Sequence, residues 1–337
     1  MKTIWKIVII CIAAGLLLCT LGIFLGASLS GLHLDETGIH LAGAYETIIA
    51  EHDLEPFKDI IVDVRYGDVE FIAADKFGID IIGSNKKSWA WELNNGTLKI
   101  TQEDNGTTFF VFGFGLIGKT LVKIYIPASA DLGAVSIHAG SGDINISSLN
   151  AGNTQINNSY GDINISGLIS DDLQIELSSG DFVGTDLSCD NISFTNSYGD
   201  GRFEGISVHN FAATIEAGDF TLKNCGADDI HIKNSYGEII ADNISSLNTT
   251  VLSGSGNINL KGEFLGKTVI NASYGDIKFS TTKEEEFYDY DISVAFGDLI
   301  FGSGRQTNNT AVKNSGLCEN KLEVSSTAGD VTVYFIK

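Results

Sequence analysis

The sequence predicts an all-β protein: a β-solenoid (β-helix-like rod) of about 19-residue repeats, preceded by one N-terminal transmembrane helix. Three observations support this fold class. A glycine followed by an acid returns with a 19-residue period through the second half of the chain. Apolar and polar residues alternate between these glycines, as in strands with one buried face. An uncharged, mostly apolar segment fills residues 7–29.

The repeat is defined by a glycine column that keeps its phase over eight copies: Gly142, Gly161, Gly180, Gly199, Gly218, Gly237, Gly256 and Gly275. An earlier copy surrounds Gly67, and later copies at Gly297 and Gly329 follow at wider intervals. The first wider interval coincides with a charged insertion at residues 283–286. A short fixed period indicates stacked units, because no single unit can bury its apolar face alone.

One unit contains two alternating segments separated by a turn. Residues 142–147 and 154–160 alternate, and residues 148–152 read as the turn. Parallel stacking would bring equivalent residues together at about 4.8 Å per rung. A 19-residue coil and a flattened 38-residue coil both fit the pattern. We favour the 19-residue coil, since a 38-residue circumference is hard to fill.

Tyrosine precedes the glycine in every second unit, at Tyr160, Tyr198, Tyr236 and Tyr274. Small residues stand in the units between them. The tyrosines share the parity of the buried columns, so we predict that they are packing devices, in which a ring followed by a small side chain fills a stacked corner. A row of aromatic rings for stacking on sugars is the alternative. The glycine then permits the positive φ of a tight corner.

An acid column follows the glycines. Its members Asp143, Asp162, Asp181, Asp200, Asp219 and Asp276 are the candidate calcium ligands, since stacked coils would align carboxylates roughly 5 Å apart. Asp after Gly also commonly caps turn amides. We predict capping, with Asn257 in the same column as support. No cofactor is therefore expected, and calcium remains the alternative.

The chain divides into four expected parts. Residues 1–30 are a cytoplasmic tip and transmembrane anchor, residues 31–56 a linker, residues 57–135 irregular N-terminal β rungs, and residues 136–337 the regular solenoid with C-terminal closing strands. The last strand, residues 331–336, is expected to close that end. Residues 94–96 predict a hairpin. Residues 109–116 predict a buried strand and turn, with a loop touching the membrane or a partner as the alternative.

The N-terminal segment predicts a location at the cell membrane. Lys2 and Lys6 precede the apolar run, while Asp35 and Glu36 follow it. This order predicts a single-pass protein with the N-terminus inside and the C-terminal body outside. Its length suits a bilayer core of about 30 Å. A cleaved signal peptide is the alternative.

Composition and motifs narrow the function. The net charge of −22 makes nucleic acid an unfavourable partner. Cys189, Cys225 and Cys318 show no metal-ligand spacing and are expected as buried free thiols. No metalloprotease, nucleophile-elbow or nucleotide-binding motif is present, so the chain is predicted not to be an enzyme. Arg202 is expected in a surface ion pair.

Three stretches carry a family resemblance: VKIYIP at residues 122–127, AVSIHAGSGDINI at residues 134–146, and serial S-x-G-D strands. Over roughly residues 57–337 the chain resembles a bacterial family of domains of unknown function described as "putative adhesin". That family also occurs in accessory proteins of Gram-positive envelope-stress operons. The resemblance implies a β-solenoid, often membrane-anchored, and offers no catalytic residues to carry over.

These observations together predict a membrane-anchored, surface-exposed β-solenoid that acts as a non-catalytic binding or adhesion module of the bacterial envelope. Its partners would be the membrane, through the N-terminal helix, and an envelope polymer, a host surface or a membrane protein. An envelope-stress accessory protein that acts through a membrane partner is the first alternative. A glycan-active β-helix enzyme is the second.

Overall fold

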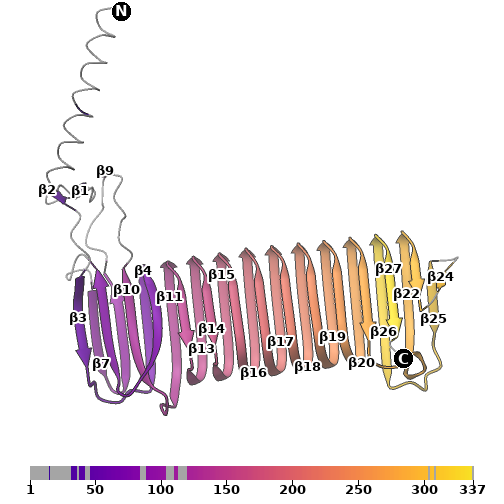
Figure 1. Cartoon of the computed structure of the whole chain (residues 1–337), viewed down its shortest axis with the longest axis horizontal. Helices are drawn as coiled ribbons and strands as arrows, with labels where there is room; N and C mark the ends of the chain where they lie inside the picture. The colour runs from indigo at the N-terminus through magenta and orange to yellow at the C-terminus, as the bar shows by residue number, and fades with distance from the viewer. Residues whose placement is uncertain are drawn as a thin grey trace, which may run out of the picture.

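The computed structural model describes Gly15 and residues 32–35, 38–41, 46–83, 89–103, 110–112, 120–302, 304–306 and 309–335. Its body is an elongated stack of β-coils, with the strands running across the long axis (Figure 1). The predicted fold class, an all-β solenoid, is confirmed for these residues.

The central strands follow one another along the rod in chain order. They are β11 (Leu132–Ser141), β12 (Ile144–Ser147), β13 (Asn150–Tyr160), β14 (Ile163–Ser166), β15 (Ile169–Ser179), β16 (Phe182–Tyr198), β17 (Gly201–Ala217), β18 (Phe220–Tyr236), β19 (Ile239–Ser255), β20 (Ile258–Tyr274) and β21 (Ile277–Thr281).

The repeating coil contains 19 residues. Ile144 pairs in parallel with Ile163, and Tyr160 pairs with Ser179, so equivalent positions of neighbouring coils stack directly. The prediction of a 19-residue coil is confirmed, and the 38-residue coil is excluded. The predicted turn at residues 148–152 is shorter in the structure, because only residues 148 and 149 separate β12 from β13. From β16 to β20 one strand of 17 residues runs around each coil, and residues with positive φ, such as Asp186, Gly205 and Asn224, lie at the bend.

The core is a set of columns with matched side-chain volumes. The predicted columns through Ile144 and Ile156 are buried along the rod. Gly201 lies between Phe182 and Phe220 in the first column. A Cβ at Gly201 would lie 2.7 Å from the ring of Phe194, so the ring takes the space that glycine leaves. The interior is therefore filled by complementary large and small residues in neighbouring coils.

At the N-terminal end of the rod, the strands do not stack in the order in which they follow one another along the chain. Its strands are β3 (Glu46–His52), β4 (Asp59–Tyr66), β5 (Asp68–Ala74), β6 (Gly78–Gly83), β7 (Trp89–Asn94), β8 (Thr97–Gln102) and β10 (Leu121–Pro127). β4 and β5 stack directly on β11 and β12. The later strands β8 and β10 pair on their other side, and β7 and β8 form the predicted hairpin.

A second, three-stranded sheet has the order β2 (Gly38–Leu41), β1 (Leu32–Asp35), β9 (Phe110–Phe112). Parts of the expected linker are thus strand, and β3 joins the main sheet by pairing with β6. Of the glycine-rich stretch at residues 109–116, the described part is strand β9.

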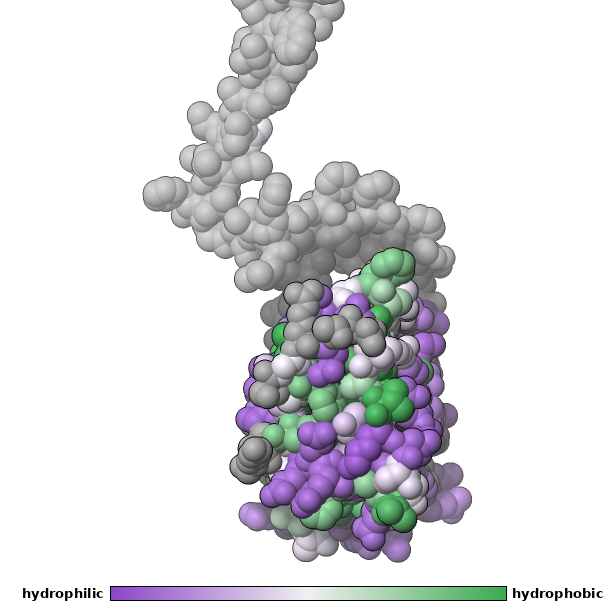
Figure 2. Space-filling model, turned by 90° about the vertical axis from the view of Figure 1, so that its right-hand side faces the viewer, coloured by the Kyte–Doolittle hydropathy of each residue, from purple (hydrophilic) through white to green (hydrophobic). Residues whose placement is uncertain are grey.

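The C-terminal end corrects one prediction. Its elements are the 3₁₀ turn η2 (Glu285–Phe287) and the strands β22 (Tyr288–Phe296), β23 (Leu299–Phe301), β24 (Gly304–Gln306), β25 (Thr310–Lys313), β26 (Asn320–Ala328) and β27 (Val331–Phe335). β27 pairs with β21 on one side and β23 on the other. The last strand therefore does not close the rod. β22 to β25 form the outermost layer, whose surface mixes hydrophilic and hydrophobic residues (Figure 2).

The predicted transmembrane segment at residues 7–29 lies outside the described residues, apart from Gly15. Within the described part of the chain, no helix has both the length and the apolar character needed to cross a bilayer.

Candidate functional site

The glycine column is a steric requirement of the stack. Every glycine of the column from Gly142 to Gly275 has positive φ, as do Gly67, Gly297 and Gly329. A Cβ on Gly161 would collide with the carbonyl oxygen of Gly142, and the same contact recurs along the column. The corner therefore accepts only glycine, because the neighbouring coil occupies the side-chain position.

The acid column caps backbone amides between coils. The amide of Asp162 donates to Asp143 Oδ1 at 3.0 Å, and that of Asp181 donates to Asp162 Oδ1 at 2.9 Å. The series continues through Asp200, Asp219 and Glu238. Asn257 fills the same role, accepting from the amide of Asp276, whose own Oδ1 accepts from the amide of Asp330. The column thus has the capping role that the sequence predicts, although each carboxylate caps a neighbouring coil rather than its own turn.

Within the described residues, no group of three or more His, Cys, Asp or Glu side chains has a metal-binding arrangement. Calcium binding by the acid column stays an untested alternative.

The packing prediction for the tyrosines is wrong. Tyr160, Tyr198, Tyr236 and Tyr274 are 62–67% exposed. Asn158 occupies the interior of the corner instead. It is buried, and its Nδ2 donates to the carbonyls of Gly142 and Gly161 at 3.0 and 3.2 Å. The strand parity ends at this bend, which turns the tyrosine ring outward.

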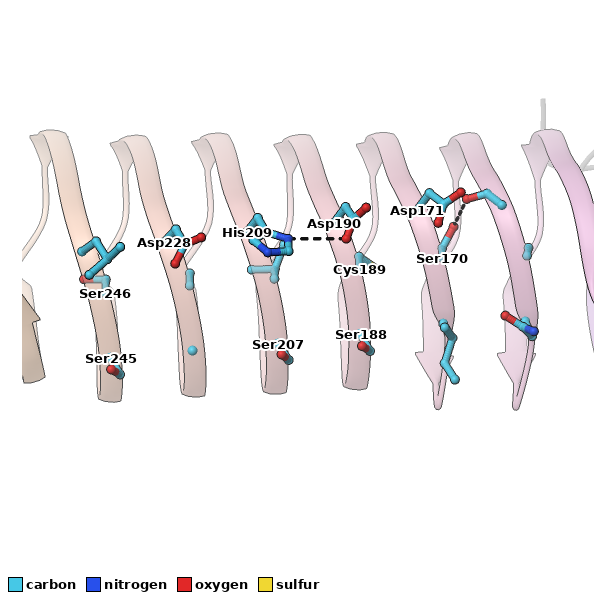
Figure 3. A pocket seen from close by; sticks show the side chains of 18 of the residues that line it. Ser170, Asp171, Ser188, Cys189, Asp190, Ser207, His209, Asp228, Ser245 and Ser246 are labelled. Carbon is cyan, nitrogen blue, oxygen red and sulfur yellow. Dashed lines mark hydrogen bonds and ion pairs between the residues drawn. The ribbon is translucent and has the colours of Figure 1, made fainter.

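A groove runs along another face of the rod. It has a volume of about 860 Å³ and crosses successive coils from Asp131 to Leu265. Equivalent residues of neighbouring coils line it, because they are register partners, as Ser188 and Ser207 are. Figure 3 shows a row of Asp171, Asp190, His209 and Asp228 beside a row of serines. An extended ligand parallel to the rod axis would meet similar groups at each coil.

The groove wall is acidic. His209 Nδ1 lies 3.4 Å from Asp190 Oδ1, and both side chains are about two-thirds exposed, so this pair adds little stability. Next to these residues in sequence, exposed amides and a carboxylate form a second ladder. Asn191 donates to Asp172 at 2.7 Å, and Asn210 donates to Asn191 at 2.7 Å. The wall offers carboxylate acceptors on strands that pair in parallel with their neighbours.

The floor of the groove presents no reactive nucleophile among the residues described next. Ser170 Oγ donates to the carbonyl of Gly152 at 2.8 Å. Cys189 is buried there, and desolvation raises the pKa of its thiol to about 11. A protonated thiol is a poor nucleophile at neutral pH. Cys225, also buried, has its pKa raised by desolvation to about 12.

Two other sequence predictions can be placed. Arg202 Nη2 lies 2.6 Å from Glu204 Oε2 in an exposed ion pair, as predicted. Cys189 and Cys225 are buried free thiols, whereas Cys318 is only partly buried.

The groove was not predicted from the sequence. Its signal was the regular spacing of Asp171, Asp190, His209 and Asp228, all outside the apolar columns. That spacing predicts a row of side chains but does not predict a concave surface.

Comparison with known proteins places the chain in a family. Solved structures similar to it include a "putative adhesin" from Bacteroides fragilis, at 15% identity, 85% of this chain and 96% of that chain covered, and TM-score 0.37. A "putative lipid binding protein" from Parabacteroides distasonis has 17% identity, coverages of 84% and 96%, and TM-score 0.40. A comparison with curated proteins found no match.

The family model for Toastrack DUF4097 matches residues 57–183 and 170–334. These two matches overlap and together cover the solenoid from β4 into β27. The chain therefore belongs to the Toastrack DUF4097 family.

Proposed function

We propose that this protein is a non-catalytic binding module on the outside of a bacterial cell, held in the membrane by residues 1–30. Its groove would hold an extended polymer of the cell envelope. The observation that carries the proposal is the continuity of the groove over coils from Asp131 to Leu265, roughly 30 Å at about 4.8 Å per coil.

The chemistry of the wall defines the ligand class. Asp171, Asp190 and Asp228 present carboxylates, and the neighbouring rows present serine hydroxyls. Such a surface favours ligands that carry amines or several hydrogen-bond donors. Repetition along the axis favours many weak contacts, whose sum depends on the number of coils engaged.

Retention on purified polymers tests the proposal. The full chain in detergent is passed over peptidoglycan, teichoic acid and host matrix protein, each with calcium and with chelator. We expect retention on one envelope polymer and about a tenfold loss for the triple variant Asp171→Asn, Asp190→Asn, Asp228→Asn.

A matched control removes three exposed acids that do not line the groove, Glu51→Gln, Glu176→Gln and Asp291→Asn. The control should bind like the natural chain. If retention falls equally in both variants, net charge rather than the groove is responsible. Loss of retention under chelation would support calcium at the acid column. No retention on any polymer would favour action through a membrane partner instead.

A further inference from the structure

A row of exposed aromatic rings follows one edge of the rod. We call it the aromatic ladder. Each ring immediately precedes a corner glycine and is 62–75% exposed. The members are Tyr66, Tyr160, Tyr198, Tyr236, Tyr274 and Phe296. None of them lines the groove described above.

The ladder alternates with small residues at every step. Ser141 pairs with both Tyr66 and Tyr160, and Ser255 pairs with both Tyr236 and Tyr274. The same alternation holds through Ser179 and Ala217. Successive rings are therefore two coils apart, about 9.6 Å.

The alternation survives where the chain leaves its regular order. Ala328 stacks between Tyr274 and Phe296, although both lie far before it in the sequence. At the other end, Tyr66 pairs with Ser141 across an equally irregular interval of the chain. Simple duplication of a 38-residue unit would not continue the pattern across these breaks. The arrangement of rings and gaps is thus a property of the assembled surface.

The rings do not contribute to the core. Their exposure leaves most of each ring in water, and none of the six side chains has a hydrogen bond or ring partner among the described residues. Single exposed apolar residues are ordinary, but a regular row of them marks a binding surface.

The small residues open recesses between the rings. A depression of about 610 Å³ lies between Tyr236 and Tyr274, with Ser253 and Ser255 on the coil between them. A ligand lying along this edge would meet ring, recess and ring in turn.

The groups beside each tyrosine indicate the chemistry of the ligand. A serine precedes each of the four, and an acid follows two residues later, as in Ser159-Tyr160-Gly161-Asp162. Hydroxyl and carboxylate oxygens accept hydrogen bonds from sugar hydroxyls, while a ring stacks on the apolar face of a pyranose. The acids and the net charge of −22 repel polyanions, which excludes nucleic acid as a partner for these rings.

We propose that the aromatic ladder binds an extended, uncharged β-1,4-linked glycan along the rod, with every second sugar stacked on a ring. Two sugars of such a chain cover nearly the same length as two coils. The sugars between would lie over the recesses. This site is separate from the acidic groove and would extend the binding surface to a second edge.

Binding to defined glycans tests the site. The full chain in detergent is titrated with chitohexaose and cellohexaose, and with amylose and polygalacturonate as controls. Amylose is uncharged but coiled, and polygalacturonate is anionic. We expect binding to the two β-1,4-linked oligosaccharides and about a tenfold or greater loss for Tyr198→Ser with Tyr236→Ser. Serine already occupies this position in neighbouring coils, at Ser179 and Ser255, so the fold accepts the change.

A control pair removes exposed apolar side chains outside the ladder, Phe287→Ser and Leu317→Ser, and should leave affinity unchanged. A second variant, Ser179→Tyr with Ser255→Tyr, fills recesses and should also weaken binding. No binding to either β-1,4 oligosaccharide, equal binding of amylose, or unchanged affinity of the tyrosine variant would overturn the proposal. The groove variant should keep its glycan affinity, which separates failure of this site from failure of the groove.

Discussion

The middle of the rod and its C-terminal end reach the same coil geometry by different chain paths. From β16 to β20, coils follow chain order and stack 19 residues apart. At the end, the coil of Gly329 stacks on that of Gly275, and the coil of Gly297 lies outside both. The amide of Asp298 donates to Asp330 Oδ1 at 2.9 Å, as in the regular corners. The corner chemistry, rather than sequence separation, therefore defines a coil.

The C-terminal end also differs from the middle in how its apolar interior is covered. A middle coil is covered by coils on both sides, whereas the last coil needs another cover. Tyr288 is fully buried there and donates from its hydroxyl to the carbonyl of Phe264. The rings of Tyr290, Phe301 and Phe335 pack on one another, with centroids of Tyr290 and Phe301 4.6 Å apart. Aromatic packing at the end replaces the missing neighbour.

The largest effect should come from removing the out-of-order strand. A chain that stops after Asp330 loses Val331 and Val333, which are fully buried between two coils. Burial of two valines contributes about 3–6 kcal/mol, so we expect that loss in the unfolding free energy of this end. Urea unfolding measures it, with Leu317→Ser as the control, since Leu317 is 88% exposed. A loss below about 1 kcal/mol would mean that the strand is peripheral.

A glycine in the middle should be the next most sensitive position. Gly199→Ala places a Cβ against the carbonyl of Gly180 at a positive φ of 125°. Strain and overpacking should cost about 2–4 kcal/mol. Gly226 is the matched control, because a Cβ there meets nothing within 4 Å. Thermal unfolding of the two alanine variants compares them, and equal midpoints would refute the steric account of the corner.

Acid should loosen the C-terminal end of the rod. Asp289 is buried and accepts from the Ser315 hydroxyl at 2.7 Å and from the amides of Ser315 and Gly316. These hydrogen bonds hold the pKa of Asp289 below its ordinary value. The folded-state pKa is depressed, so the stabilisation is present above the ordinary value, near pH 4, and is lost as pH falls through the folded pKa.

Asp289→Asn should therefore lower the thermal midpoint at pH 7, and its difference from the natural chain should shrink toward pH 3. Asp291→Asn, an exposed acid on the same strand, serves as the control. A difference that stays constant between pH 7 and pH 3 would contradict this role of the carboxylate.

The smallest effect concerns thiol reactivity. Burial raises the pKa of Cys189 to about 11 and that of Cys225 to about 12, so both should resist alkylation at pH 7 and react only after unfolding. Cys318, at the end of the rod, is partly exposed. Mass spectrometry after iodoacetamide treatment should find Cys318 modified before Cys189 and Cys225. Early modification of Cys189 would show that the middle opens more readily than its pairing indicates.

Coil length and the buried columns could be predicted because alternation and a 19-residue phase are local properties that stacking preserves. The outward tyrosines could not, since strand parity does not pass through a corner. Strand alternation places Asn158 inside with Ile156, but nothing in the sequence around Tyr160 shows that Asn158 makes the corner hydrogen bonds or that the tyrosine ring turns outward. The return of β27 into the stack also depends on pairing between distant segments, which spacing alone does not reveal.

The alternation of rings and recesses has a consequence for how such a chain can lengthen. Duplicating one coil would set two rings or two recesses side by side and shift everything beyond them out of phase. Duplicating two coils would keep the phase. Within the regular stretch, the 38-residue spacing of Tyr160, Tyr198, Tyr236 and Tyr274 corresponds to one pair of coils, which is the smallest insertion that keeps rings and recesses alternating along the edge.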